Sequence, residues 1–397
     1  MKKNVIFLGA GPTSLAGIWE LSSFDFNIFV VGYNKHEIGR YSRFVKYLGS
    51  ADPENESNKL LEILLDYSSS QDHKASIIPT GDEYVEFLYE NKKVLSKHYN
   101  ASVFKNNWYE TIIDKELFSK TCMKLNIPQP NTWYESGDLS LNDWAESARY
   151  PCIIKPRIYH HWKKHFGLKK GFIVNNIADL LSTTEKIKKI HNDIIVQEII
   201  QGEDDKIVIF SCNISNGNVK QIFTGRKYRQ YPYGFGTTTL AKSEQIDEII
   251  DDSISLLSSI NYSGVCDVEY KYDQLDGQYK IIEINPRIGR WYRLVTQSNK
   301  YPLVSSIYEM VDNNNGKESL SDTRQTYGKI WIFIFRDLFV INKNKNISKT
   351  ELLKYYFFRK KIHCVYNYRD IMPAIMYIFE IFMKYYHHKN RDVQKEN

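Results

Sequence analysis

The chain has 397 residues and a formal net charge of +6, from 53 Lys and Arg against 47 Asp and Glu. Apolar residues make up 42% and charged residues 25%, so the chain can bury a core and is not intrinsically disordered. A charge this small over this length does not by itself predict nucleic-acid binding, and we expect none.

The cysteines and the lengths of the apolar runs indicate in which cellular compartment the protein is expected. The five cysteines are scattered and never form a C-x-x-C pair, which argues against a disulfide framework or a zinc site. The N-terminus runs directly into a predicted strand without the features of a signal peptide, and no uncharged apolar run reaches about 18 residues. We therefore expect a cytoplasmic protein without a transmembrane helix.

Strand-like and helix-like segments alternate through the first part of the chain. Short apolar runs predict strands, and apolar residues at helical spacing predict helices. The expected strands are 4–8, 27–31 and 75–79, and the expected helices are 14–21, 60–67 and 83–95. This alternation predicts a parallel sheet covered by helices, and hence a Rossmann-like N-terminal domain over residues 1–107.

A glycine pair follows the first predicted strand and invites a dinucleotide-binding interpretation. The fingerprint is G-x-G-x-x-G/A, but after Gly9 and Gly11 its last position holds Ser14, and no acidic residue follows the second strand. We therefore expect a phosphate-poor relative of that fold, with an NAD(P)-binding oxidoreductase as the alternative. Residues 80–83 follow the end of a strand, where a non-nucleotide substrate or a simple helix cap is expected.

Helices and strands mix in the next segment, for which we predict a domain over residues 108–325. It includes a small lid subdomain at about 150–200. Hairpin turns are expected at Asn216-Gly217 and at 274–277. The expected helices are 114–125, 178–191 and 245–260, and the expected strands are 150–156, 171–175, 193–200, 206–214, 219–223, 264–272 and 278–284.

Acidic and amide side chains gather on the last two of these strands. Residues two apart in a strand point to one face, so Glu283 projects with Asn285, and Asp267 with Glu269. If the strands pair through the 274–277 turn, Glu269 faces Glu283. Two carboxylates and an amide oxygen then converge, as a hard cation such as Mg²⁺ requires. Solvated acids on a surface hairpin are the alternative, but Glu283 lies within I-I-E-I-N-P, where an unbound charge is costly.

Basic residues supply the complementary charge. Arg287 lies two residues beyond Asn285, where it could neutralise a transferring phosphoryl group. Lys115 opens a predicted helix and Lys155 ends an apolar strand. Each alone is an ordinary surface lysine, but with the carboxylates they become candidate phosphate contacts. The basic segment between Lys155 and Gly171 suits a flap over a polyphosphate, or else a solvated turn with a buried Trp.

The run V-Q-E-I-I-Q-G-E-D-D at 196–205 is a predicted strand followed by a glycine and an acidic cluster. Such a run can offer backbone groups to an adenine and a carboxylate to ribose hydroxyls, although an ordinary strand and acidic turn is the alternative. In chain order, Lys115, Lys155 in I-I-K-P, this run, Glu269 and the terminal E-I-N-P-R resemble the ATP-grasp superfamily. The resemblance covers about residues 1–325.

Within that superfamily the chain is most similar to the branch of D-aspartate ligase and related carboxylate–amine ligases. The stretches that carry this similarity are R-Y-S-R-F-V-K (40–46), I-I-P-T-G-D-E-Y-V-E-F-L (77–88), Q-E-I-I-Q-G-E-D-D (197–205), G-R-K-Y-R-Q-Y-P (225–232) and E-Y-K-Y-D (269–273). The resemblance implies an α/β protein with an ATP-grasp fold, α+β in its central part, that uses ATP and Mg²⁺, with Mn²⁺ as an alternative ion.

The resemblance also implies a reaction and a set of roles. A carboxylate oxygen attacks the γ-phosphate to give an acylphosphate and ADP, and an amine then displaces phosphate to form an amide. One substrate would belong to a cell-envelope precursor, either peptidoglycan-like or a surface polysaccharide. The implied roles are metal binding by Glu269, Glu283 and Asn285; ATP binding by Lys115, Lys155, Gln197, Glu198, Ile199, Ile200 and Asp205, the last being the first choice among 203–205; and phosphate, acyl-phosphate or carboxylate contacts by Arg226, Arg229 and Arg287.

The tail at 326–397 differs from the rest of the chain. It holds 14 Lys and Arg against 6 Asp and Glu, a net of +8, whereas the remaining residues total −2. We predict a basic, aromatic, helical extension with an apolar helix at 373–386. That helix packs on the body or lies on a membrane surface, and a non-catalytic ATP-binding scaffold at a membrane is the third functional hypothesis.

Overall fold

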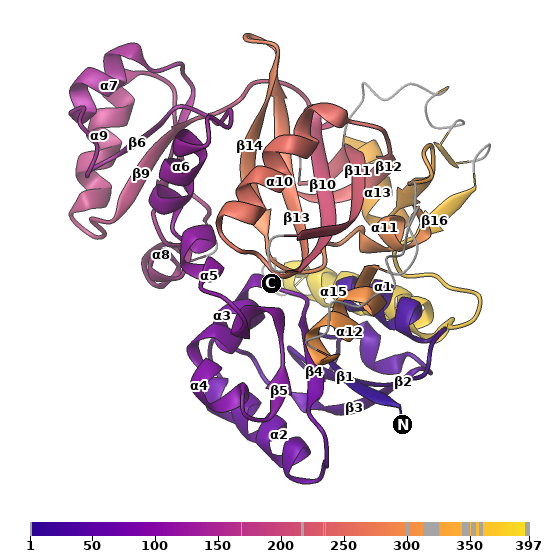
Figure 1. Ribbon diagram of the computed structural model, residues 1–397. Helices are drawn as coiled ribbons and strands as arrows, with labels where there is room; N and C mark the ends of the chain where they lie inside the picture. The colour runs from indigo at the N-terminus through magenta and orange to yellow at the C-terminus, as the bar shows by residue number, and fades with distance from the viewer. Residues whose placement is uncertain are drawn as a thin grey trace.

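The computed structural model describes residues 2–167, 169–215, 218–232, 234, 236–298, 302–312, 325–343, 350, 355–356 and 360–393 (Figure 1). The expected turn at Asn216-Gly217 lies outside these residues. As the sequence predicts, the protein is a mixed α/β structure; the strands of the described residues lie in three sheets.

The N-terminal sheet is parallel, with strand order β3-β2-β1-β4-β5. Its central strand β1 is apolar, and Val5 to Leu8 are fully buried because helices cover both faces. Strand β3 and the short β5 are additions to the three expected strands. The strands are β1 (Lys3–Leu8), β2 (Phe26–Gly32), β3 (Val45–Ser50), β4 (Ala75–Pro79) and β5 (Tyr99–Asn100), and the helices are α1 (Pro12–Leu21), η1 (Ile38–Tyr41), α2 (Ser57–Ser69), α3 (Asp82–Glu90), α4 (Lys92–Leu95) and η2 (Ser102–Phe104).

A four-stranded antiparallel sheet, in the order β6-β9-β7-β8, has its own core around Trp133, Trp144 and Trp162 (Figure 1, upper left). Two helices lead into it, α5 (Trp108–Ile113) and α6 (Lys115–Lys124). The elements of the sheet and its cover are β6 (Thr132–Tyr134), α7 (Leu141–Ser147), β7 (Cys152–Pro156), α8 (Tyr159–Phe166), β8 (Phe172–Val174), α9 (Ile177–Lys188) and β9 (Ile194–Glu198).

Helix α8 corrects the expectation of a basic loop between Lys155 and Gly171. Trp162 is fully buried, with its ring centroid 4.2 Å from that of Phe166 one turn later. Apolar side chains four residues apart share one face of a helix, so this pair pins the segment to the sheet as a helix. The lysines and histidines around the pair concealed this periodicity.

The third sheet has seven strands in the order β14-β13-β10-β11-β12-β15-β16. Its first five strands are antiparallel, and β14 forms one edge. The expected return strand at 219–223 is the start of a much longer strand, β11. The elements are η3 (Asp204–Lys206), β10 (Ile207–Ser215), β11 (Asn218–Tyr231), β12 (Thr237–Ser243), η4 (Asp247–Ile249), α10 (Ile250–Ser259), β13 (Gly264–Asp273), β14 (Gln278–Asn285), α11 (Tyr292–Ser298) and α12 (Pro302–Asp312).

The C-terminal segment packs on the rest of the chain. It adds β15 (Ile330–Ile332) and β16 (Lys361–His363) to the seven-stranded sheet, so it is not helical throughout as predicted. Its helices are α13 (Ile334–Lys343) and α15 (Met372–Val393), and α15 contacts η1 of the N-terminal domain. No helix among the described residues is long and apolar enough to cross a membrane.

Candidate active site

A cleft of about 570 Å³ lies where the N-terminal domain, the four-stranded sheet and the seven-stranded sheet meet. Its lining combines the two predicted lysines with two of the three predicted metal ligands, Glu283 and Asn285. The side chains that concern the chemistry are Asp82, Glu83, Lys115, Lys155, Lys170, Gln197, Glu283 and Asn285.

The strand pairing brings the predicted metal ligands together. In the register of β13 and β14, Glu269 lies opposite Glu283 and Asp267 opposite Asn285. Burial raises the pKa of Glu269, and the nearby Glu283 carboxylate raises it further against the opposing effect of Lys227. Two carboxylates and an amide that share one face offer the oxygen ligands that a hard divalent cation such as Mg²⁺ takes.

Arg287 connects this edge to the N-terminal domain. Its Nη2 donates to Asn285 Oδ1 at 3.0 Å, and its Nε donates to Asp82 Oδ1 at 2.8 Å. The predicted arginine therefore lies beside Asn285, and it is held there by an acid at the start of α3. The loop 80–83, assigned from sequence to a substrate site or a helix cap, borders the cleft through Asp82 and Glu83.

The structure does not bring Arg226 and Arg229 to the carboxylates. Arg226 of β11 lies opposite Val208 of β10, whose side chain belongs to a hydrophobic core. The Nε of Arg226 donates to the Glu244 carboxylate at 2.7 Å. Arg229 lies in an irregular part of β11 and forms a buried ion pair of 2.7 Å with Asp337 of α13. Both arginines are already paired on other surfaces, which corrects their assignment to the phosphate site.

Lys227, which lies between those arginines in the chain, is the side chain that reaches the site. Its Nζ is 3.2 Å from the carboxylate of Glu269, and it is only 4% exposed. Alternate residues of a strand face opposite sides, so Lys227 faces Glu269 while Arg226 does not. The sequence shows three basic residues but not the phase of the strand, and the pairing of β10 with β11 and β13 supplies it.

The two predicted lysines lie in different elements, Lys115 in α6 and Lys155 in β7, and an ion pair between Asp114 and Arg157 joins these elements. Asp114 caps α6 by accepting from the backbone N–H groups of Glu116 and Leu117, and it also binds Arg157, with an Nη2–Oδ2 distance of 2.6 Å. Arg157 directly follows β7, and its carbonyl accepts from the Lys115 backbone N–H at 3.2 Å. This contact fixes the start of α6, with Lys115, against the end of β7, with Lys155.

The charges of these lysines depend on their surroundings. Burial, and then the neighbouring Lys155, lowers the pKa of Lys115 to about 8, although Glu283 opposes the change. Burial also lowers the pKa of Lys155, whose Nζ donates to Gln197 Oε1 at 3.0 Å. Two crowded ammonium groups form a site that an anion with several oxygens, such as a polyphosphate, would stabilise.

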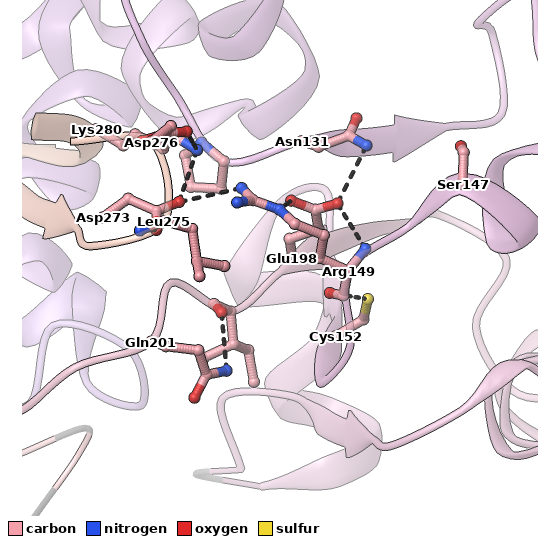
Figure 2. A network of polar contacts seen from close by, with 12 residues as sticks. Asn131, Ser147, Arg149, Cys152, Glu198, Gln201, Asp273, Leu275, Asp276 and Lys280 are labelled. Carbon is pink, nitrogen blue, oxygen red and sulfur yellow. Dashed lines mark hydrogen bonds and ion pairs between the residues drawn. The ribbon is translucent and has the colours of Figure 1, made fainter. Parts of the chain in front are cut away.

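The segment predicted to line adenine runs along the end of β9 (Figure 2). The Glu198 carboxylate accepts from the backbone N–H of Arg149 at 2.8 Å and from its Nε at 3.1 Å. Arg149 also reaches Asp273 at 3.0 Å, and Lys280 holds Asp273 from the other side at 2.8 Å. Glu198 is thus engaged in a link between two sheets. The backbone N–H groups of Glu198 and Ile199 also have partners, since they donate to the carbonyls of Asn131 and Pro151 at 3.0 Å each.

The acidic residues at 203–205 differ in their surroundings. Asp204 is buried, and its carboxylate accepts from the side chain and backbone of Gln230, at 2.7 and 3.2 Å. Asp205 is half-buried, and its carbonyl accepts from Arg226. Asp205 Oδ1 is buried without a hydrogen-bond partner.

The glycine loop after β1 is occupied by a carboxylate of the chain itself. Glu37 Oε2 accepts from the backbone N–H groups of Ala10 and Tyr33, at 2.9 and 2.6 Å. In a dinucleotide site such N–H groups would face a pyrophosphate, and an acid at this position repels one. The structure therefore argues against the NAD(P)-binding alternative.

Comparisons with known proteins agree with this arrangement. A family profile described as "Carbamoyl-phosphate synthase L chain, ATP binding domain" matches residues 194–315. D-aspartate ligase of Enterococcus faecium (strain Aus0004) is 23% identical over 301 residues, which cover 73% of this chain and 72% of that protein. A carbamoyl phosphate synthase large chain of Methanothermobacter thermautotrophicus is 23% identical over 203 residues, 48% of this chain, and the match spans only 18% of that protein.

Solved structures share the fold at low sequence identity. The biotin carboxylase domain of the Hydrogenobacter thermophilus 2-oxoglutarate carboxylase, in complex with MgADP and bicarbonate, has a TM-score of 0.62 at 16% identity and covers 83% of this chain and 74% of its own. The L-amino acid ligase from Bacillus licheniformis has a TM-score of 0.60 at 14% identity, with 82% and 78% covered. The chain therefore has an ATP-grasp fold and is similar in sequence to ATP-grasp ligases, with D-aspartate ligase among its relatives.

Proposed function

We propose that the chain joins a carboxylate to an amine through an acylphosphate, at the cleft that Lys115, Lys155, Glu283 and Asn285 line, with Glu269 opposite Glu283 on the neighbouring strand. The observation that carries this proposal is the opposition of two lysines to a carboxylate pair across one cleft. That arrangement suits a phosphate chain held between ammonium groups on one side and a cation on the other.

The protein's share of the chemistry is positioning and charge. Lys115 and Lys155 would hold phosphate oxygens, Gln197 would orient Lys155, and Arg287 would stabilise the charge of the phosphoryl group or the substrate carboxylate. Mg²⁺, held by Glu269, Glu283 and Asn285, would supply charge neutralisation on the phosphates. Lys227 would keep the Glu269 carboxylate in place.

For the substrates, we propose an amino acid or a similar molecule as one partner and a cell-envelope precursor or a surface polysaccharide as the other. Similarity to D-aspartate ligase, an enzyme named for an amino acid, supports the first part. The second part rests on resemblance to that branch.

The experiment that tests the proposal is a phosphate-release screen with Mg-ATP. Amino acids are paired with uronic-acid or nucleotide-sugar acceptors, and products are identified by mass spectrometry. We expect one pair to stimulate ADP and phosphate release in equal amounts and to yield an amide. Stimulated ADP release without any amide, or thermal stabilisation by NAD(P) but not by Mg-ATP, would contradict the assigned reaction.

A further inference from the structure

The outer face of α15 is apolar along the part of the helix whose side chains are described. Between residues 371 and 383 every exposed side chain is apolar, and the only charged residue, Glu380, is half-buried. These side chains recur at the spacing of one helical face. They are Ile371 (49% exposed), Met372 (44%), Ile375 (48%), Ile378 (38%), Phe379 (57%), Phe382 (67%) and Met383 (40%).

The opposite face of the same helix already has a partner. Pro373 and Tyr377 are buried, and the Tyr377 ring lies 5.2 Å from the ring of Phe333 next to β15. Asp370, just before the helix, accepts from Trp19 Nε1 at 2.8 Å and from the Ser42 hydroxyl at 2.6 Å. The helix is therefore fixed to the body, and its exposed face is a stable surface rather than the inner side of a detached segment.

A contiguous apolar surface of this kind marks an interaction site, and the surrounding charge indicates its partner. Arg43 and Arg369 are both exposed at the start of the helix, with their guanidinium groups 5.7 and 6.0 Å from the ring of Phe44. Tyr366 and Tyr368 are 49% and 80% exposed beside them.

The sequence extends this pattern. The segment 326–397 carries a net charge of +8. Cations and tyrosines that border an apolar helical face are the combination that binds the headgroup region of an anionic bilayer.

We propose that this face of α15 binds an anionic membrane surface, with its isoleucine, methionine and phenylalanine side chains in the acyl boundary. The helix that carries this face contacts η1 of the N-terminal domain, and the same domain contributes Asp82 and Glu83 to the cleft.

Vesicle co-sedimentation of the full chain tests the proposal without ATP or substrates, so its outcome is separate from that of the ligase reaction. The probes are vesicles of phosphatidylglycerol with phosphatidylcholine and vesicles of phosphatidylcholine alone. We expect binding to the anionic vesicles that weakens as salt is raised. Replacing both Phe379 and Phe382 with Ser should lower the partition coefficient about tenfold or more.

Two further variants keep the result interpretable. Leu139→Ser with Ile190→Ser removes two apolar side chains that are 54% and 56% exposed elsewhere, and it should bind like the wild type. Arg43→Gln with Arg369→Gln should weaken only anionic binding. Absence of binding to anionic vesicles at low salt, equal binding by the phenylalanine variant, or a dimer in sedimentation velocity that depends on Phe379 and Phe382 would overturn the proposal.

Discussion

At the residue scale, the cleft contains two lysines, Lys115 and Lys155, whose pKa values are lowered by their surroundings. Burial removes part of the hydration that stabilises the ammonium groups of Lys115 and Lys155; in addition, Lys155 lowers the pKa of Lys115, and Lys170 lowers that of Lys155. An anion that binds between them would stabilise the charged form of both lysines. ATP affinity should therefore depend on the protonation of these side chains.

The pKa of about 8 for Lys115 predicts a pH dependence. The charged form predominates below this value and binds phosphate, so the dissociation constant for Mg-ATP should stay level below pH 8 and rise above it, by up to about tenfold per unit. Calorimetric titration between pH 7 and pH 9.5 measures this. Lys115→Arg should remove the rise, because arginine stays charged throughout. A rise of the same size in that variant would mean that another group is responsible.

The residues of the site were predicted unevenly from the sequence, for a physical reason. Glu283 and Asn285 were found because a two-residue spacing places both on one strand face, whichever face that is. Arg226 and Lys227 could be separated only by knowing which face of β11 turns toward Glu269, and this depends on pairing with β10, a long-range contact. Asp114 gave no signal beyond a helix cap, because its partner Arg157 is distant in sequence.

At the element scale, the start of α6 and the end of β7 behave as one unit. Asp114 serves both, since it caps the helix and accepts three hydrogen bonds from the Arg157 guanidinium. The Arg149 network in Figure 2 is a second link, between β9 and the β13–β14 hairpin. These contacts set the position of the lysines relative to the carboxylates.

Replacing Asp114 separates the cap from the ion pair. Asp114→Ala loses both and should lower stability by about 1 kcal/mol or somewhat more, while it weakens Mg-ATP binding because Lys115 and Lys155 are no longer fixed together. Asp114→Asn keeps an acceptor for the cap, so it should be close to wild type in thermal midpoint and still weakened in ATP binding. Thermal unfolding and ATP titration measure the two effects. Unchanged ATP binding in both variants would show that the contact does not position the lysines.

Most helices and strands were predicted where the apolar residues of a segment follow one regular spacing, helical or strand-like. The strand at 75–79 matches β4, and the helix at 114–125 matches α6 with its ends moved by one residue. Helix α8 was missed because its buried Trp162 and Phe166 are surrounded by basic residues. Strand β12 was also missed, because its burial is set by the neighbouring strands β11 and β15 rather than by its own threonine-rich sequence.

At the scale of the whole molecule, three parts of the chain complete one site. The N-terminal domain contributes Asp82, which holds Arg287, and the C-terminal segment contributes Asp337, which removes Arg229 from the site. Local sequence could not show either contact, because each joins residues more than 100 positions apart. The sequence of the basic tail likewise does not show which face of α15 packs on the body and which face is exposed to solvent.

ADP formation from Mg-ATP in the presence of active substrates measures whether Glu283 and Lys155 serve one nucleotide site. Glu283→Gln and Lys155→Ala should each reduce the rate by about 100-fold or more with an unchanged thermal midpoint. Glu248→Gln, a change at an exposed residue of η4, should leave the rate unchanged. Full ADP formation by folded Glu283→Gln or folded Lys155→Ala would show that these two residues do not serve one nucleotide site.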